Sequence, residues 1–236
     1  KIKPKILFHF AWKISYPNYQ KSLDNFKSLQ FSKRLYFLFC KHGGKKAYLI
    51  GSDQEYNATN NTFYEKKIKK KKHNSYSLSK YYLYDYIEKI SKKFNSQFTW
   101  FRVFPSYGSL KENPLRLIPS LIISSITNQE YSIKNPYKEI YLLHIDDVVK
   151  AIYLVFCKDI TGIVNIASKK KIKILDIKKY IFGEIDKLEY LYDKLNVEKI
   201  ELKKLNLINF KESFNINKDL KKLKNIYKKK FKIYSQ

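Results

Sequence analysis

The chain has 236 residues, 44% of them hydrophobic and 17% aromatic, which is enough for one large domain or one and a half. It has no apolar run that approaches the ~18 residues of a membrane span, so we expect no membrane partner and no secretory segment. It has only two cysteines, without CxxC spacing, so we expect a reduced, cytoplasmic protein. The net charge of +27 is carried almost wholly by Lys, since only Arg34, Arg102 and Arg116 are arginines, so we expect a solvated surface that binds nucleic acid only non-specifically.

The first half of the sequence alternates strand-like and helix-like segments. Short aliphatic and aromatic runs predict buried strands, and apolar residues at roughly helical spacing, such as Leu23, Phe26 and Leu29, predict a helix between the first two strands. Gly43 and Gly44 are placed to end that helix. The predicted segments are a strand at 5–12, a helix at 22–42, a strand at 46–52, a polar linker at 53–74, a helix at 76–94 and a strand at 98–108.

The second half continues this alternation, and the remainder is Lys-rich and predicted to be helical. Strands that alternate with helices are typical of a parallel sheet wrapped by helices, the α/β class. Ligands of such sheets bind at the carboxyl ends of the strands, where His9, Ser52 and the loop after Phe104 fall. The predicted segments are a helix at 115–126, a strand at 139–145, a helix at 146–158, a strand at 162–168 and a helix at 173–185.

Tyr76 and Lys80 stand four residues apart in a predicted helix, so they share a face. A free tyrosine has a pKa near ~10, and a nearby ammonium lowers it, which suits a general acid/base at neutral pH. Ser52 ends a strand just before the loop that leads to Tyr76, so its hydroxyl is a candidate to hold a substrate oxygen. Two alternatives stay open: a half-buried aromatic at a helix start, in a chain with 21 tyrosines, and a loop hydroxyl bonded to its own backbone.

His144, Asp146 and Asp147 invite comparison with a metal site, because His and Asp are metal ligands. An aspartate directly before a helical pattern is also a preferred N-cap. We expect Asp146 or Asp147 to cap the following helix, and no metal.

Six segments resemble, in the same order, those of the extended short-chain dehydrogenase/reductase family, the NAD-dependent epimerases and dehydratases of nucleotide sugars. They are "FHFAW", "LIGSDQEY", "YSLSK", "WFRVFPSYG", "YLLHIDDVVKAI" and "GIVNIAS". The resemblance covers most of the chain. It implies a Rossmann-like parallel sheet flanked by helices, with a small C-terminal substrate-binding part.

The resemblance also implies roles for individual residues. Tyr76 is the general acid/base, Lys80 lowers its pKa and bonds the nicotinamide ribose, and Ser52 orients the substrate oxygen. The implied cofactor is NAD or NADP, and its binding residues are Ala11, Trp12, Asn25, Tyr76, Lys80 and Phe104. The implied substrate-binding residues are Ser52, Asp53 and Ser106.

Departures from the family pattern set further expectations. The family begins with a Gly-rich turn that cradles the cofactor pyrophosphate, whereas the six glycines here, at 43, 44, 51, 108, 162 and 183, form no such motif. The chain starts at Lys1 and has no Met, so we expect an N-terminally truncated protein. The expected domains are a partial NAD(P)-binding domain at 1–108 and, at 109–236, a mixed region with the substrate-binding part and a returning strand and helix.

The resemblance implies an NAD(P)-dependent epimerase or 4-keto reductase that acts on a nucleoside-diphosphate sugar, with a homodimer as a further expectation. Gln54 stands where dehydratases carry a glutamate, which disfavours sugar dehydration. Two alternatives stay open. One is a catalytically impaired remnant, or half of an enzyme whose N-terminal half is separately encoded. The other is a Lys-rich, non-specific nucleic-acid-binding protein.

Overall fold

The computed structural model describes residues 3–56, 62–66, 74–188 and 199–234. Contacts between residues divide the chain into two compact units, each discontinuous in sequence. The first comprises Lys1–Phe104, Ala151–Ile166 and Glu198–Phe210, and the second Pro105–Lys150, Ala167–Val197 and Lys211–Gln236. The expected domains, 1–108 and 109–236, remain a prediction.

The first unit is built on a four-stranded parallel sheet, which confirms the predicted fold class. Its strands are β1 (Ile6–His9), β2 (Lys46–Ile50), β4 (Gln97–Val103) and β8 (Gly162–Ile166), in the order β1-β2-β4-β8. β2 and β4 are flanked on both sides, and their middle residues, such as Tyr48 and Trp100, are buried as the apolar runs predicted.

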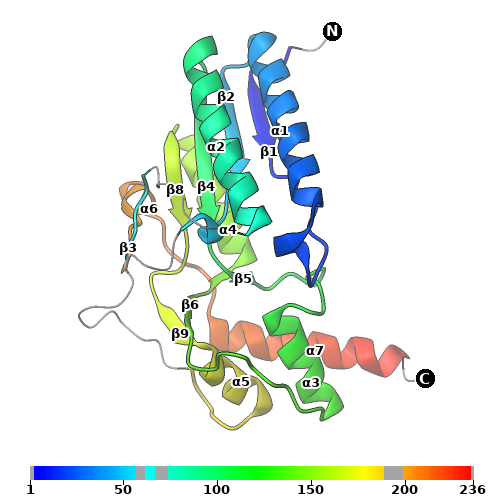
Figure 1. Cartoon of the computed structure of the whole chain (residues 1–236). Coiled ribbons are helices and arrows are strands. Elements are labelled where there is room, and N and C mark those ends of the chain that lie inside the picture. The colour runs from blue at the N-terminus through cyan, green and yellow to red at the C-terminus, as the bar shows by residue number, and fades with distance from the viewer. Residues whose placement is uncertain (1–2, 57–61, 67–73, 189–198, 235–236) are drawn as a thin grey trace. The chain divides into compact units, whose positions relative to one another are not determined.

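Helices cover both faces of this sheet. α1 (Asp24–Lys41) and α2 (Ser75–Phe94) pack side by side on one face (Figure 1), and Leu29 and Ile87 are buried there. The first-unit part of α4 (Ile145–Cys157) covers the other face, where Phe156 contacts Tyr48 edge to face at 5.5 Å.

Local sequence explains where α2 begins and ends. The Asn74 side chain accepts a hydrogen bond from the Ser77 backbone N–H at 2.9 Å, which satisfies a donor of the first turn. Asn95 ends the helix in the left-handed region, at φ 48°. The predicted helix at 76–94 is confirmed to within one residue.

One burial prediction for the N-terminal part is wrong. The strand predicted at 5–12 is shorter and lies at the end of the sheet, so Phe8 and Phe10 are about half exposed, at 47% and 45%. The helix predicted after this strand forms as α1, where Leu29 is buried, whereas Leu23, the residue just before α1, is 74% exposed. Helical spacing does not tell which apolar residues face a neighbouring element when they surround the whole helix.

Several short helices and strands complete the first unit. The linker predicted at 53–74 contains a strand that pairs in parallel with a strand of the C-terminal third; its residues 57–61 and 67–73 lie outside the described part. These elements are η1 (Tyr19–Lys21), η2 (Asp53–Glu55), β3 (Thr62–Phe63), β10 (Lys199–Ile200) and α6 (Lys203–Leu207).

The second unit has its own core, in which Leu121, Ile122 and Ile177 are fully buried. The segment predicted as one strand at 139–145 forms two strands with different partners: β6 (Glu139–Tyr141) is antiparallel to β9 (Lys171–Lys173), and β7 (Leu143–His144) is parallel to β5 (Ser106–Tyr107). The elements are β5 (Ser106–Tyr107), α3 (Leu117–Thr127), β6 (Glu139–Tyr141), β7 (Leu143–His144), β9 (Lys171–Lys173), α5 (Ile174–Phe182) and α7 (Ile216–Tyr234).

The prediction that Asp146 or Asp147 caps the helix α4 is wrong, because α4 already begins at Ile145 and both aspartates lie in its first turn. The buried carboxylate of Asp147 accepts hydrogen bonds from the backbone N–H groups of Ser213 and Phe214, at 3.0 to 3.2 Å. The carboxylate therefore ties a distant loop to the helix instead. None of the helices in the described ranges is both long and apolar enough to cross a bilayer.

Candidate active site

Ser52 lies just beyond the carboxyl end of β2 and begins η2. Its Oγ accepts a hydrogen bond from the Gln54 backbone N–H at 3.2 Å, and the Glu55 side chain returns to accept from the Ser52 backbone N–H at 2.7 Å. This reciprocal pair is a capping box. It holds the hydroxyl at the edge of the sheet where ligands of parallel sheets bind.

Tyr76 lies in the first turn of α2 and is 7% exposed. Burial raises the pKa of its phenol above the ordinary value, and a side-chain hydrogen bond with Ser52 works in the opposite direction. Ser52 also donates to Asp53 Oδ1 at 3.1 Å. Ser52 and Tyr76 therefore meet, as the order of the motifs predicted, but the phenol is held in its neutral form.

Lys80 lies one turn further along α2 and is only 3% exposed. Its Nζ donates to the Ile50 carbonyl oxygen at 2.8 Å and lies 5.8 Å from the Tyr76 ring centroid. Burial lowers the pKa of Lys80 to about 7, and the charge of Glu55 opposes that lowering. The pKa of Tyr76 is raised and not lowered as expected, and the largest cause is desolvation of the phenol.

Trp12 covers the ammonium of Lys80. The centroid of its ring is 3.8 Å from Lys80 Nζ, and its ring and that of Tyr76 are perpendicular, with their centroids 6.3 Å apart. The indole N–H donates to Asn25 Oδ1 at 2.9 Å, and the Asn25 amide in turn donates to the Tyr19 carbonyl oxygen at 2.6 Å. Asn25 is fully buried, so it fixes this aromatic side of the site from α1.

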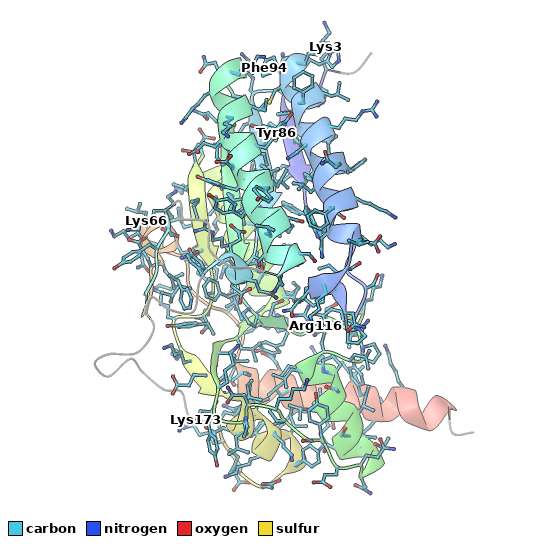
Figure 2. The ribbon with its side chains drawn as sticks, in the orientation of Figure 1. Lys3, Lys66, Tyr86, Phe94, Arg116 and Lys173 are labelled. Carbon is cyan, nitrogen blue, oxygen red and sulfur yellow. The ribbon has the colours of Figure 1, made fainter. Side chains whose placement is uncertain are left out.

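Glu55 carries a buried negative charge behind the site. Its carboxylate accepts from Trp100 Nε1 at 3.0 and 3.1 Å and from Arg102 Nε at 3.1 Å, and both Glu55 and Arg102 are 1% exposed. Arg102 also donates to the carbonyl oxygen of Lys66, a residue labelled in Figure 2, and lies 4.5 Å from the Tyr56 ring centroid. This pairing satisfies a charge that would otherwise be costly to bury.

Comparison with known proteins decides the family. Residues 1–167 match the profile of the NAD dependent epimerase/dehydratase family, which is well over half of the chain. The chain belongs to the NAD-dependent epimerase/dehydratase family. No curated protein matches it in sequence.

Solved structures agree with this family at the level of the fold. MoeE5 in complex with UDP-glucose and NAD is 14% identical, with a TM-score of 0.78 over 96% of this chain and 80% of that one. UDP-glucose 4-epimerase of Thermotoga maritima is 15% identical, with a TM-score of 0.72 over 97% and 79%. UDP-N-acetylglucosamine 4-epimerase of Methanobrevibacter ruminantium is 17% identical, with a TM-score of 0.70 over 94% and 76%.

Three further predicted site residues lie in different surroundings. Ala11 is exposed and Phe104 is buried against Tyr56 and Phe63. Ser106 belongs to β5 in the second unit. Their roles remain predictions.

Sequence reasoning missed two residues that shape the site. The first is Glu55, whose signal was the spacing Ser52-x-x-Glu55, typical of a capping box. The second is Tyr19, whose ring packs edge to face on Tyr76 at 5.2 Å; no pattern distinguishes it among 21 tyrosines. The described residues contain no group of three or more His, Cys, Asp or Glu side chains arranged to hold a metal ion.

Proposed function

We propose that this chain catalyses NAD-dependent epimerisation or 4-keto reduction of a nucleoside-diphosphate sugar. The observation that carries the proposal is the meeting of Ser52, Tyr76 and Lys80 at the carboxyl ends of β2 and of the neighbouring strands. Family membership supports the use of NAD, and the UDP-sugars bound or converted by the similar proteins support a UDP-sugar as the substrate class.

The residues present fit the ribose end of the cofactor. An ammonium has three N–H donors, and within the described residues Lys80 Nζ makes one hydrogen bond, to Ile50. Two donors are thus left to bind a ribose diol. NAD, when bound, accepts a hydride from a sugar carbon and returns it.

Tyr76 and Ser52 would handle the proton that accompanies this hydride. The Tyr76 hydroxyl exchanges a proton with the sugar oxygen, and Ser52 holds that oxygen in position through a second hydrogen bond. Asp53 accepts from Ser52 at 3.1 Å, which orients the serine hydroxyl when no sugar is bound. Burial of the Tyr76 and Ser52 side chains keeps water away from the reacting oxygen.

The half-enzyme alternative keeps one observation in its favour. No glycine-rich turn for a pyrophosphate occurs among the six glycines. Under this alternative, a separately encoded N-terminal half supplies that turn, and the present chain supplies the acid/base residues.

The test is turnover of UDP-glucose and UDP-N-acetylglucosamine with NAD, for the natural protein and for Tyr76→Phe. We expect Tyr76→Phe to lower turnover by about 100-fold or more, the usual contribution of a general acid/base, with cofactor affinity unchanged. The matched control is Tyr86→Phe, on the same helix and partly buried, which should leave turnover unchanged.

Each result decides something. Equal turnover by Tyr76→Phe and the natural chain would refute the acid/base role. Cofactor binding without turnover supports the impaired alternative. Activity that appears only when a glycine-rich N-terminal part is added supports the half-enzyme alternative.

A further inference from the structure

Lys80 is a buried cation whose hydrogen-bonding capacity is only partly used. Its ammonium is 3% exposed and donates to the Ile50 carbonyl oxygen at 2.8 Å. Among the described residues, no second acceptor lies within hydrogen-bond distance of its Nζ. Buried donors are nearly always satisfied in proteins, so the two remaining N–H groups require another explanation.

The face of Trp12 takes the place of that missing acceptor. At 3.8 Å from the ring centroid, the ammonium is well within the range of a cation–π contact. Such a contact partly compensates a desolvated charge, but it offers no lone pair to the individual N–H groups.

Trp12 is held more weakly than the residues around it. It lies in the segment between β1 and η1, which has no regular secondary structure, and it is half-buried, whereas Tyr76 and Lys80 are buried. Its indole makes one hydrogen bond among the described residues, to Asn25. The partner is rigid, because Asn25 is fully buried and its amide also donates to the Ser22 carbonyl oxygen at 2.9 Å.

We propose that Trp12 is a movable aromatic cover on Lys80, and that it swings away when a nicotinamide ribose brings hydroxyl oxygens to the two unused donors of the ammonium. This inference rests on the proposed function for its ligand, while the cover itself rests on the contacts of Trp12 alone. Trp12 is thus a residue that sets cofactor affinity in this chain: the cation–π contact has to be broken before the ribose can bind.

The first experiment tests the cover without any ligand. Reductive methylation with formaldehyde, read out by mass spectrometry of the peptide that contains Lys80, measures how accessible its amine is. A pKa lowered to about 7 leaves much of the amine neutral and reactive near neutral pH once reagent reaches it. We expect Trp12→Ala to raise the methylation rate about 10-fold, corresponding to a cover worth about 1.4 kcal/mol.

Two further variants make this result specific. Trp12→Phe keeps an aromatic face without the Asn25 hydrogen bond, so we expect a rate between those of the natural chain and Trp12→Ala. Leu23→Ala changes a residue that is 74% exposed and should leave the rate unchanged. Equal protection of Lys80 in the natural chain and in both Trp12 variants would overturn the cover.

The second experiment tests the ligand with nicotinamide mononucleotide, which carries the ribose but needs no pyrophosphate cradle. Binding by calorimetry should be about 10-fold tighter in Trp12→Ala than in the natural chain. Tryptophan emission should change on binding in the natural chain but not in Trp12→Ala, since the remaining Trp100 is fully buried.

The outcomes separate the two claims. Weaker or equal binding by Trp12→Ala would overturn the cover as a determinant of affinity. A further outcome is faster methylation of Lys80 in Trp12→Ala while neither protein binds the mononucleotide. That result would support the cover, overturn the ribose as its ligand and count against the proposed function.

Discussion

Replacing Glu55 by glutamine tests how much its buried carboxylate stabilises the residues around the site. The change keeps the size and shape of the side chain but removes its charge and turns one acceptor oxygen into a donor. In the natural chain the two oxygens receive hydrogen bonds from Ser52 N, Trp100 Nε1 and Arg102 Nε, at 2.7 to 3.1 Å. All three of these partners are donors, so a glutamine NH2 group that faces any of them loses a hydrogen bond.

The expected loss of stability follows from this geometry. With its oxygen turned toward Ser52, the glutamine amide keeps two of these bonds and faces Arg102 with a donor. Arg102 is 1% exposed, and it then lacks its carboxylate. Removing one partner of a buried ion pair costs ~3–5 kcal/mol in the free energy of unfolding. For a chain of this length, that lowers the Tm by roughly 6–20 °C, at about 2–4 °C per kcal/mol.

Urea unfolding followed by circular dichroism measures this loss. The control is Asp85→Asn, which removes the i,i+4 pair on the outside of α2, where the Lys89 side chain is 73% exposed and lies 2.9 Å from Asp85. That change should cost no more than ~0.5 kcal/mol. If Glu55→Gln were no less stable than Asp85→Asn, the carboxylate would not be holding Arg102, and the reasoning from burial would be refuted.

Two further predictions concern the same region. Lys80 has a pKa of about 7 when folded, against an ordinary value of 10.5, so the unfolded chain binds more protons between those pH values. We expect Lys80→Met to be more stable than the natural chain below about pH 7, and this advantage to shrink as the pH rises toward about 10.5. The measurement is the free energy of urea unfolding of both proteins at about pH 6.5 and about pH 9. A difference that is the same at both pH values would contradict the prediction. Gly51→Ala would place its Cβ 2.3 Å from Glu55 Oε1 and from Trp100 Nε1, so we expect a loss of ~1–3 kcal/mol by overpacking, which unchanged thermal unfolding would rule out.

The sequence predicted those features that depend on local chemistry. β2 and α2 lie where their residues predicted, because a continuous apolar run bounded by Gly51 and a helix between two asparagines are local signals. Chain order also places Ser52 just after β2 and Tyr76 and Lys80 in the first turns of α2, so all three lie near the carboxyl edge of the sheet.

Features that depend on distant neighbours were not predictable in this way. Phe8 belongs to an apolar run like those of the central strands, but exposure at the end of a sheet depends on which strands flank it. The contact between Trp12 and Lys80 joins residues 68 positions apart by number, and no periodicity encodes it. The pKa of Tyr76 followed burial and not the nearby lysine, because desolvation is set by the whole surrounding structure.

The protonation states of the two buried titratable groups of the site, Tyr76 and Lys80, depend on each other. Burial favours the neutral phenol of Tyr76 and also the neutral amine of Lys80, so each charge alone is disfavoured. A phenolate next to an ammonium, in contrast, stabilises both charges, because their attraction is strong where water is excluded. Tyr76 can therefore give up its proton most easily while Lys80 keeps its own. Glu55 favours that state of Lys80, since its negative charge opposes loss of the lysine proton. The same carboxylate that fixes the Ser52 backbone thus supports the charge of Lys80, while its own negative charge disfavours the phenolate of Tyr76.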